Sequence, residues 1–370
     1  MKIVITGADG FIGTNLRIRL RELGHSDIVR ITRETTSKQL ADAVSSGDFI
    51  FHLAGVNRPK TEADFLSGNA GFTDRLCAAL AASGRSAPVV MSSSTQAALD
   101  NPYGRSKLAA EERLRRYGQE AGAKVYIFRL TNVFGKWARP SYNSAVATFC
   151  YNVTRSLPIS VNDPAAALRL IYIDDVVEAF IKCLEMPAPP AGFVDASPVY
   201  ETTVGAVADS IHGFAESRSS LISPPVGVGL IRALYSTYVS YLPAESFAYT
   251  VPRYGDQRGM FSEVLKTPDC GQFSYFTAHP GITRGEHYHH TKTEKFIVIR
   301  GKARFGFRHI ETNERHDIFV QGGEGQIVET VPGWAHDITN VGDDELIVML
   351  WANEIFDRSR PDTIAMKVIA

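Results

Sequence analysis

Residues 1–13 read MKIVITGADGFIG, and this stretch decides the fold of the first part of the chain. KIVIT is a short apolar run rich in β-branched residues, which predicts a buried parallel strand. Gly7, Gly10 and Gly13 follow at once, and glycines let a chain turn tightly and approach a pyrophosphate. Leu16 and Leu20 recur at helical spacing, which predicts a helix from Ile12 to Leu23. The stretch therefore predicts a strand, a phosphate-binding turn and a helix in that order.

Beyond this stretch, the chain continues in the same pattern as far as about residue 184. Apolar runs at 48–55, 87–94 and 124–130 alternate with amphipathic stretches, which is typical of a parallel sheet covered on both faces. After about residue 246 the pattern changes to short, alternating strands separated by glycines, as in a closed or sandwich-like β-barrel. We therefore predict an α/β domain over 1–245 and an all-β domain over 246–370.

Composition limits the kinds of partner that the protein can have. The 370 residues carry a formal net charge of −1, which does not favour a nucleic-acid or membrane-surface partner. The cysteines lack any regular spacing and are expected to be reduced thiols. No signal peptide and no membrane-spanning apolar run is evident, so we expect a cytoplasmic protein. The four cysteines are Cys77, Cys150, Cys183 and Cys270.

A YxxxK motif lies at Tyr103–Lys107 on a predicted helix. A spacing of four places the phenol and the ammonium on one face, one turn apart. The cation should lower the pKa of Tyr103 and so help it to deliver a proton to a carbonyl oxygen. The motif follows a strand that ends in Ser92, Ser93 and Ser94, and the glycine turn lies upstream.

Together these features resemble the extended short-chain dehydrogenase/reductase family, whose fold is a Rossmann-type α/β domain. The resemblance implies a catalytic triad of Ser94, Tyr103 and Lys107, with Ser93 as the second choice of hydroxyl and a substrate residue. It also implies that Asn132, in RLTNVFG, contacts substrate, and that the HLAG segment passes beneath the nicotinamide-side ribose. The implied cofactor-binding residues are Gly7, Gly10, Phe11, Ile12, Gly13, Arg30, Arg33, Leu53, Ala54, Gly55, Tyr103 and Lys107.

The end of the second predicted strand bears on the choice of cofactor. Family members that prefer NAD carry an acidic residue there, which accepts hydrogen bonds from the ribose. This chain has Thr32 and then Arg33, which could pair with a 2′-phosphate, and Arg30 could assist it. We therefore expect NADPH, although a solvated arginine would fit the same pattern.

The family also contains dehydratases, which place an Asp-Glu pair after the triad hydroxyl. This chain has Thr95, Gln96 and Ala97 there, so no carboxylate pair is available for removing water. Reduction of a keto sugar is the expected reaction.

A second group of residues with metal-ligand chemistry lies near the C-terminus. His287 and His289 are two residues apart and would share a face of a β-strand. Glu294 follows in the same predicted hairpin, and His336 comes from a later strand. Three imidazoles and a carboxylate suit Zn²⁺, although Mn, Fe, Co or Ni would accept them too. We predict a divalent metal site here, either catalytic or structural.

The frame from Gly281 to Gly301 resembles the first cupin motif. Residues 255–264 (GDQRGMFSEV) and RGEHYHH resemble signatures of nucleotide-sugar 3,5-epimerases, which are cupins. This resemblance implies that His287 is the base beside a ketone, that Lys295 lies near the keto oxygen and that Arg258 contacts substrate. His289 replaces the usual glutamine, so the role of His287 stays open between ligand and base.

A reductase and an epimerase domain in one chain resemble the bifunctional CapF/WbjC-type enzymes. The resemblance covers the full length, including HLAGVNRP, HHTKTEKF and WANEIFDRSRPDT. It implies a UDP-2-acetamido-2,6-dideoxy-hexos-4-ulose substrate, C3 epimerisation by the cupin, and NADPH reduction at C4 to the L-talose product. We further expect a homodimer, for which the cupin domain is a candidate interface. The alternative is a monofunctional NADPH-dependent reductase with a structural, dimerising cupin.

Overall fold

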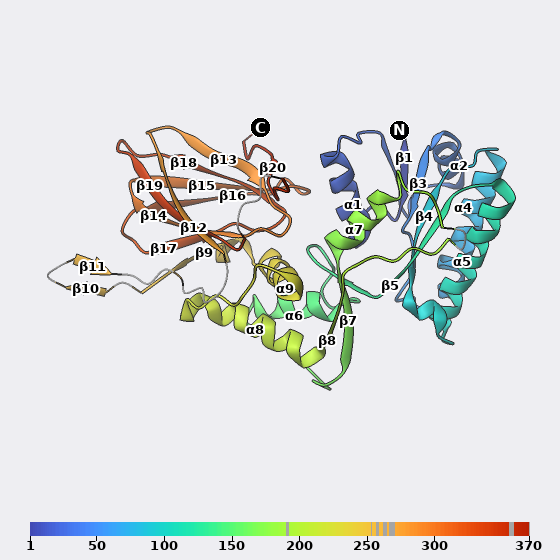
Figure 1. Cartoon of the computed structure of the whole chain (residues 1–370), viewed down its shortest axis with the longest axis horizontal. Coiled ribbons are helices and arrows are strands. Elements are labelled where there is room, and N and C mark those ends of the chain that lie inside the picture. The colour runs from blue at the N-terminus through green and yellow to red at the C-terminus, as the bar shows by residue number, and fades with distance from the viewer. Residues whose placement is uncertain are drawn as a thin grey trace. The chain divides into compact units, whose positions relative to one another are not determined.

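The structure is a computed structural model and describes residues 1–189, 192–252, 254–256, 259–261, 265, 271–354 and 359–369. The chain forms two compact units, shown in Figure 1. Unit 1 contains residues 1–134, 142–144 and 168–201, and unit 2 contains the remainder.

Unit 1 is built on a five-stranded parallel sheet. Its central strands are apolar and wholly buried because helices cover both faces. The strands, in spatial order, are β2 (Ile28–Ile31), β1 (Ile3–Thr6), β3 (Phe49–His52), β4 (Val89–Ser94) and β5 (Val125–Leu130). A smaller sheet adds β6 (Asn132–Phe134), β7 (Ala167–Tyr172) and β8 (Val199–Thr203), the last of which ends just beyond unit 1.

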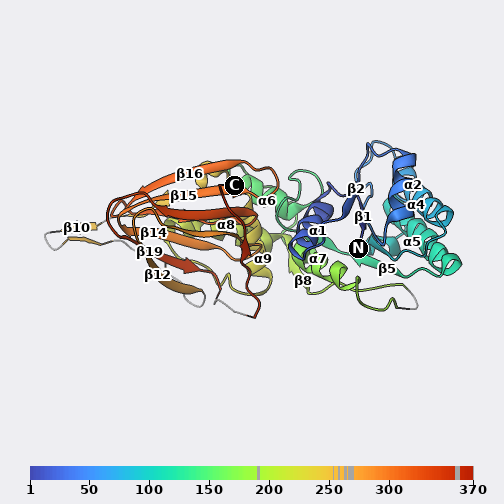
Figure 2. The same ribbon diagram turned by 90° about the horizontal axis from the view of Figure 1, so that it is seen from above.

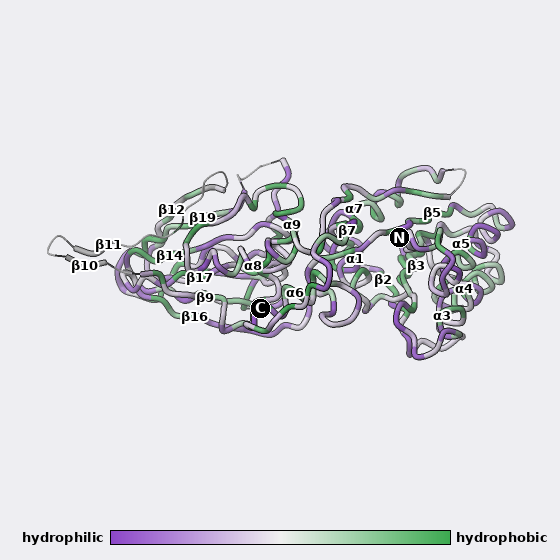
Figure 3. Tube along the Cα trace, turned by 90° about the horizontal axis from the view of Figure 1, so that it is seen from below, coloured by the Kyte–Doolittle hydropathy of each residue, from purple (hydrophilic) through white to green (hydrophobic). Residues whose placement is uncertain are grey.

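The helices of unit 1 lie on the two faces of this sheet, with α1 and α7 on one side and α2, α4 and α5 on the other (Figure 1). Helix α5 illustrates the local signals: Asn101 caps its start, Pro102 is its first residue, and Gly122 ends it with φ +62°. The traces of α4 and α5 alternate between hydrophobic and hydrophilic segments (Figure 3). The helices are α1 (Phe11–Glu22), α2 (Ser37–Ser46), α3 (Ala63–Gly68), α4 (Ala70–Ala82), α5 (Pro102–Ala121) and α7 (Ile173–Lys182).

Unit 2 contains two antiparallel sheets that pack face to face, as the two strand layers in Figure 2 show. The aromatic rings of Phe296 and Phe305 meet between the layers, with centroids 5.8 Å apart. One sheet is β12 (Gln272–Ala278), β19 (Leu346–Ala352), β14 (Glu294–Arg300), β17 (Gln326–Glu329) and β9 (Ala248–Thr250). The other is β16 (Arg315–Gln321), β15 (Lys302–His309), β18 (Trp334–Asn340), β13 (Thr283–Tyr288) and β20 (Ile364–Ala365). Strand β10 (Tyr254–Asp256) pairs antiparallel with β11 (Gly259–Phe261).

Among its described residues, unit 2 also contains the helices α6 (Ala145–Val153), α8 (Val204–Ser220) and α9 (Gly229–Ser240). They pack against one another, and two of them reach the first sheet through one buried carboxylate. Arg218 of α8 forms an ion pair of 2.7 Å with Glu329 of β17, and the Tyr235 hydroxyl of α9 lies 3.5 Å from the same side chain. The compact units therefore divide the chain differently from the boundary predicted at residue 246.

The predicted fold class is confirmed: a Rossmann-type α/β unit precedes antiparallel, cupin-like sheets. The predicted helix from Ile12 to Leu23 is α1, one residue earlier at each end. Within the part of the chain described above, none of the helices combines the length and the apolar character that crossing a bilayer demands.

Candidate functional site

The glycine turn after β1 forms a concave backbone surface, called the cradle here, which would be filled if Gly7 or Gly13 carried a side chain. Gly7 has φ +67°, and a Cβ there would lie 2.8 Å from the backbone nitrogen of Ala54. A Cβ on Gly13 would lie 2.3 Å from the carbonyl oxygen of Gly7. Gly10 caps α1 without a side chain, so backbone N–H groups at the helix start remain available for an anion. The cradle therefore fits the pyrophosphate of a dinucleotide.

Several predicted cofactor residues lie around this cradle. Phe11 and Ile12 open helix α1 and are half-buried, and Leu53 and Ala54 meet Gly7 from the end of β3. The Thr6 hydroxyl accepts hydrogen bonds from the backbone nitrogens of both Leu53 and Ala54, at 3.2 Å each. The structure therefore brings the TGADGFIG and HLAG segments together, as predicted.

The two predicted arginines differ in their surroundings. Arg30 of β2 pairs with Asp9 of the glycine turn, whereas Arg33 is exposed just after the strand. Sequence reasoning missed this ion pair because it joins residues of two separate elements. It holds the Arg30 guanidinium beside the turn.

The predicted triad residues lie at the end of β4 and the start of α5. The Ser94 hydroxyl hydrogen-bonds the Tyr103 side chain. Burial raises the pKa of Tyr103, and the bond to Ser94 opposes that rise. Burial likewise lowers the pKa of Lys107 to about 8, and its Nζ donates to the Ser92 carbonyl at 2.8 Å. The prediction that Lys107 lowers the pKa of Tyr103 is therefore wrong in this structure, because burial dominates and the ammonium is bonded to the backbone.

Ser93, the second choice of hydroxyl, faces a different environment. It is buried and donates to Glu111 of α5, whose other oxygen accepts from Arg129 at 2.7 Å. Its alternation with Ser94 explains the difference, because neighbouring residues of a strand face opposite sides. Sequence reasoning missed Glu111, although it lies one helical turn after Lys107.

Asn132 and Arg258 are the other two predicted substrate residues, and the structure describes the first of them. Asn132 is exposed at the start of β6 and donates to the Arg169 carbonyl at 3.1 Å. Arg258 lies outside the described residues.

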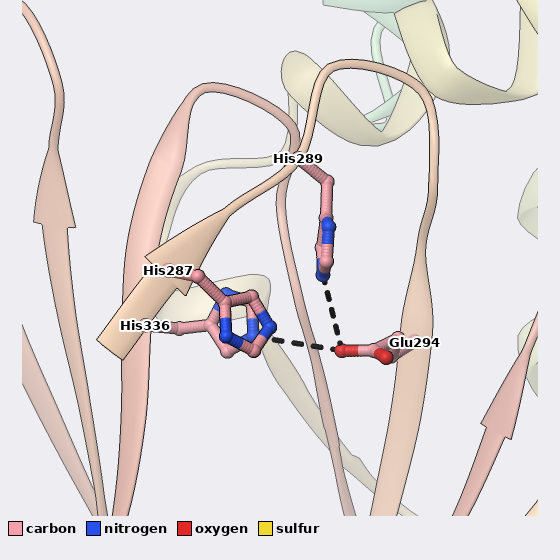
Figure 4. Close-up of side chains that lie close together, drawn as sticks. All are labelled: His287, His289, Glu294 and His336. Carbon is pink, nitrogen blue, oxygen red and sulfur yellow. Dashed lines mark hydrogen bonds and ion pairs between the residues drawn. The ribbon is translucent and has the colours of Figure 1, made fainter. Parts of the chain in front are cut away.

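The predicted metal ligands converge on one point (Figure 4). Their ligand atoms all lie within 4.8 Å of one another. His289 Nε2 and His336 Nε2 approach Glu294 Oε2 at 3.3 and 3.5 Å. Adjacent ligands of a tetrahedral Zn²⁺ with ordinary bond lengths are about 3.3 Å apart, so these spacings suit such an ion.

Each ligand reaches the cluster from a defined element. His287 of β13 and His336 of β18 are direct cross-strand partners in one sheet, and Glu294 begins β14 in the facing sheet. His289 lies one residue after β13, not on the strand as predicted. A bulge at Glu286, with φ +56°, shifts the register just before His287. The spacing of two still brings both imidazoles to the cluster.

The protonation states suit a cation. Burial, together with the neighbouring imidazoles of His336 and His289, lowers the pKa of His287 to about 4. Burial alone would raise the pKa of Glu294, but hydrogen bonds with His289 and His336 hold it well below its usual value. Among the described residues, Nδ1 of buried His336 lacks a hydrogen-bond partner, and its Nε2 lies 3.5 Å from Glu294 Oε2. Neutral imidazoles beside an ionised carboxylate are the form that binds a divalent metal.

Lys295, predicted to lie with His287 near a keto oxygen, faces away from the cluster. Glu294 points between the sheets, so its neighbour on β14 points to the opposite face. There Lys295 Nζ contacts Glu329 at 2.8 Å and the Tyr249 hydroxyl at 3.0 Å. Burial alone would lower the pKa of Lys295, but Glu329 outweighs it and holds the pKa well above its usual value. The structure therefore does not bring Lys295 to the cluster, and its place near a keto oxygen stays a prediction.

The fold and these sites define an enzyme class. Residues 3–193 match the model of the NAD dependent epimerase/dehydratase family, and residues 254–364 match the polysaccharide biosynthesis C-terminal domain. The chain belongs to the NAD dependent epimerase/dehydratase family. It is 54% identical over 368 residues to UDP-2-acetamido-2,6-β-L-arabino-hexul-4-ose reductase of Pseudomonas aeruginosa (strain PA103), covering 100% of this chain and 99% of that protein.

Solved structures agree with this relationship. The capsular polysaccharide assembling protein CapF from Staphylococcus aureus is 41% identical, with a TM-score of 0.69 and complete coverage of both chains. The predicted resemblance to CapF/WbjC-type enzymes is thereby confirmed. UDP-glucose 4-epimerase of Thermus thermophilus, solved with NAD, is 21% identical with a TM-score of 0.50. The match covers 58% of this chain and 83% of the epimerase chain. At this identity it supports the fold alone.

Proposed function

We propose that this chain is a bifunctional nucleotide-sugar enzyme with two successive reactions. Its cupin domain epimerises C3 of a UDP-2-acetamido-2,6-dideoxy-hexos-4-ulose, and its Rossmann domain reduces the C4 ketone to UDP-2-acetamido-2,6-dideoxy-L-talose. The observation that carries the proposal is the full-length similarity to a reductase named for a UDP-linked hexul-4-ose. The presence of a hydroxyl-phenol-lysine set and a His₃Glu cluster in one chain supports the division of labour.

The reduction uses the residues around Tyr103. The bound dinucleotide supplies the hydride for C4. The Ser94 hydroxyl, already bonded to Tyr103, orients the ketone oxygen, and the Tyr103 phenol delivers a proton to it. Burial raises the pKa of this phenol, which favours the protonated form that the step needs.

NADPH is the proposed cofactor because two arginines lie where a 2′-phosphate would be recognised. Arg30 is held by Asp9 beside the glycine turn, and exposed Arg33 follows β2. The ratio of kcat/KM for NADPH to that for NADH tests this assignment. Arg33→Ala should lower that ratio by about tenfold by removing one ion pair with the phosphate; an unchanged ratio would contradict the assignment.

The epimerisation is assigned to the His₃Glu cluster, with Zn²⁺ as the proposed ion. A bound divalent cation supplies Lewis acidity that stabilises negative charge on the ketone oxygen when C3 loses its proton. His289, Glu294 and His336 are buried and would hold the cation, whereas His287 is partly exposed and would be the residue that substrate reaches. Reduction at C4 would then draw the reversible epimerisation forward.

The two roles left open for His287 predict different outcomes for His287→Ala. A hydrogen bond with the Gly285 backbone occupies one ring nitrogen of His287, so the other nitrogen is the one that would act. Zinc content and C3 exchange should be measured together on the purified variant. Retained zinc with lost exchange would assign His287 as the base, whereas lost zinc would assign it as an essential ligand.

The test of the whole proposal is one reaction in D₂O with NADPH and UDP-4-keto-6-deoxy-N-acetylhexosamine. Mass spectrometry and proton NMR should find solvent deuterium at C3 and hydride-derived protium at C4. Reduction without deuterium would leave a monofunctional reductase with a structural cupin. Absence of reduction would overturn the proposal altogether.

A homodimer through the cupin domain is part of the proposal. Strand β12 is at the edge of its sheet, and Phe273, Tyr275 and Met349 on the outer face of this sheet are 44, 73 and 36% exposed. An apolar face beside a strand at the edge of the described sheet suits a second copy of the same chain. Tyr275→Lys should shift the mass in light scattering from dimer to monomer; a wild-type monomer would contradict this assignment.

A further inference from the structure

The loop from His289 to Thr293 joins the two arms of the metal cluster. It leaves β13 directly after Tyr288 and enters β14 at Glu294, so one metal ligand lies at each end of it. Such a loop has backbone N–H groups that no strand partner satisfies, and buried N–H groups need acceptors. Here a side chain from far along the sequence supplies them.

That side chain is Asp362, in the segment just before β20. Its Oδ1 accepts from the His290 backbone nitrogen at 2.9 Å. Its Oδ2 accepts from the backbone nitrogens of Thr291 and Lys292 at 2.7 and 2.8 Å, and from the Thr291 hydroxyl at 3.0 Å. One carboxylate therefore holds three successive residues of the loop.

The backbone of the same residue reaches the metal ligand itself. The Asp362 carbonyl oxygen is bonded to Nδ1 of His289. A carbonyl can only accept, so Nδ1 carries the proton and the lone pair lies on Nε2. Nε2 is the nitrogen 3.3 Å from Glu294, inside the cluster. The carboxylate thus places a carbonyl that selects the ligating tautomer of His289.

We propose that Asp362 is the positioning residue of the metal centre. Its carboxylate fastens the C-terminal segment to the loop, and its carbonyl then orients His289 with Nε2 toward the ion. Asp362 does not contact the ion in this arrangement. The inference rests on the proposed metal centre, and it assigns to the C-terminal segment a role in metal affinity.

Asn353 offers a matched control because it holds the same loop from another side. Its Oδ1 accepts from the Thr293 backbone nitrogen at 3.0 Å, and its Nδ2 donates to the Thr291 carbonyl at 3.3 Å. Asn353 is fully buried, and these two bonds of its side chain go to the loop backbone and not to the imidazole of His289. Asn353→Ala therefore loosens the loop without releasing the imidazole.

The experiment measures the zinc Kd of the full-length protein by chelator competition, together with the Tm of the metal-free form. Asp362→Asn and Asp362→Ala should weaken zinc binding by about 10- to 100-fold, the usual effect of losing an outer partner of a ligand. Asn353→Ala should lower the Tm but change the Kd by less than about threefold. In a His289→Ala background, Asp362→Asn should weaken zinc binding no further, because both changes remove the same ligand.

Wild-type zinc affinity in folded Asp362→Asn would overturn the inference, as would equal losses of affinity in Asp362→Ala and Asn353→Ala. If the Asp362 variants do not fold, ¹⁵N NMR of the wild-type apoprotein decides: a proton on Nδ1 of His289 is expected, and a proton on Nε2 overturns the inference. If wild-type protein binds no stoichiometric Zn, Mn, Fe, Co or Ni, the proposed metal centre fails instead.

Discussion

The cofactor cradle of unit 1 and the metal cluster of unit 2 are assembled from residues at very different separations along the chain. Gly7, Gly10 and Gly13 lie in one turn between β1 and α1, and their roles follow from local backbone geometry. The metal cluster joins β13, β14 and β18 of two facing sheets and depends on Asp362 from a further segment. A site formed by one turn tolerates few substitutions within that turn. A site formed between two sheets depends instead on the register of the paired strands and on the sheet face that each side chain occupies.

Tyr103→Phe should give the largest effect and should separate the two sites. The variant keeps the ring but removes the proton that reaches the C4 oxygen, so NADPH oxidation should fall by about 10²- to 10⁴-fold. Exchange of the C3 proton with D₂O should continue at the wild-type rate because the metal cluster is untouched. Loss of both activities in a folded variant would contradict independent sites.

Lys295→Met should act on stability and not on the chemistry of C3. Removing one partner from the buried group of Lys295, Glu329 and Arg218 should cost about 3–5 kcal/mol of unfolding free energy. Lys302→Met, at an exposed lysine, should stay within about 0.5 kcal/mol. The measurements are denaturant unfolding and C3 exchange of the zinc-loaded protein; lost exchange with unchanged stability would restore Lys295 to the active site.

Tyr103 and Lys295 also show how much of the two sites can be predicted from the sequence. The glycine turn, the Ser94–Tyr103 pair and the four metal ligands were all predictable because each motif has a characteristic spacing. The face of Lys295 was predictable too, since it follows Glu294 on a strand and alternation sends the two in opposite directions.

The remaining features depend on contacts between distant segments or on burial. Asp362 lies on a segment remote from His289, and no spacing rule connects them. The pKa of Tyr103 is set by its burial, which a helical spacing alone does not reveal. Helices α8 and α9 belong to unit 2, and the contacts of Arg218 and Tyr235 with Glu329 join segments that are about 90 or more residues apart.

Gly7→Ala and Gly84→Ala form a matched pair that tests the local character of the cradle. Both glycines have φ +67°, so each substitution should cost about 1–2 kcal/mol of stability from the left-handed backbone. A Cβ on Gly84 meets nothing within 4 Å, whereas one on Gly7 collides with Ala54. By calorimetric titration, NADPH affinity should fall at least about tenfold in Gly7→Ala alone; equal affinities would show that the cradle can adjust.

Acid sensitivity of unit 1 should come partly from His52, and its sign follows from burial. Burial, together with the charge of Lys107, lowers the pKa of His52 to about 3. The ring is bonded to Thr6 and Thr73 at 2.9 and 2.8 Å. The unfolded chain binds a proton near pH 6.5 while the folded chain does not, so stability is lost as pH falls below 6.5. That loss approaches about 1.4 kcal/mol per pH unit from this group. His52→Gln should reduce the slope of unfolding free energy against pH between about 6 and 4; an unchanged slope would mean that His52 is already protonated in the folded protein.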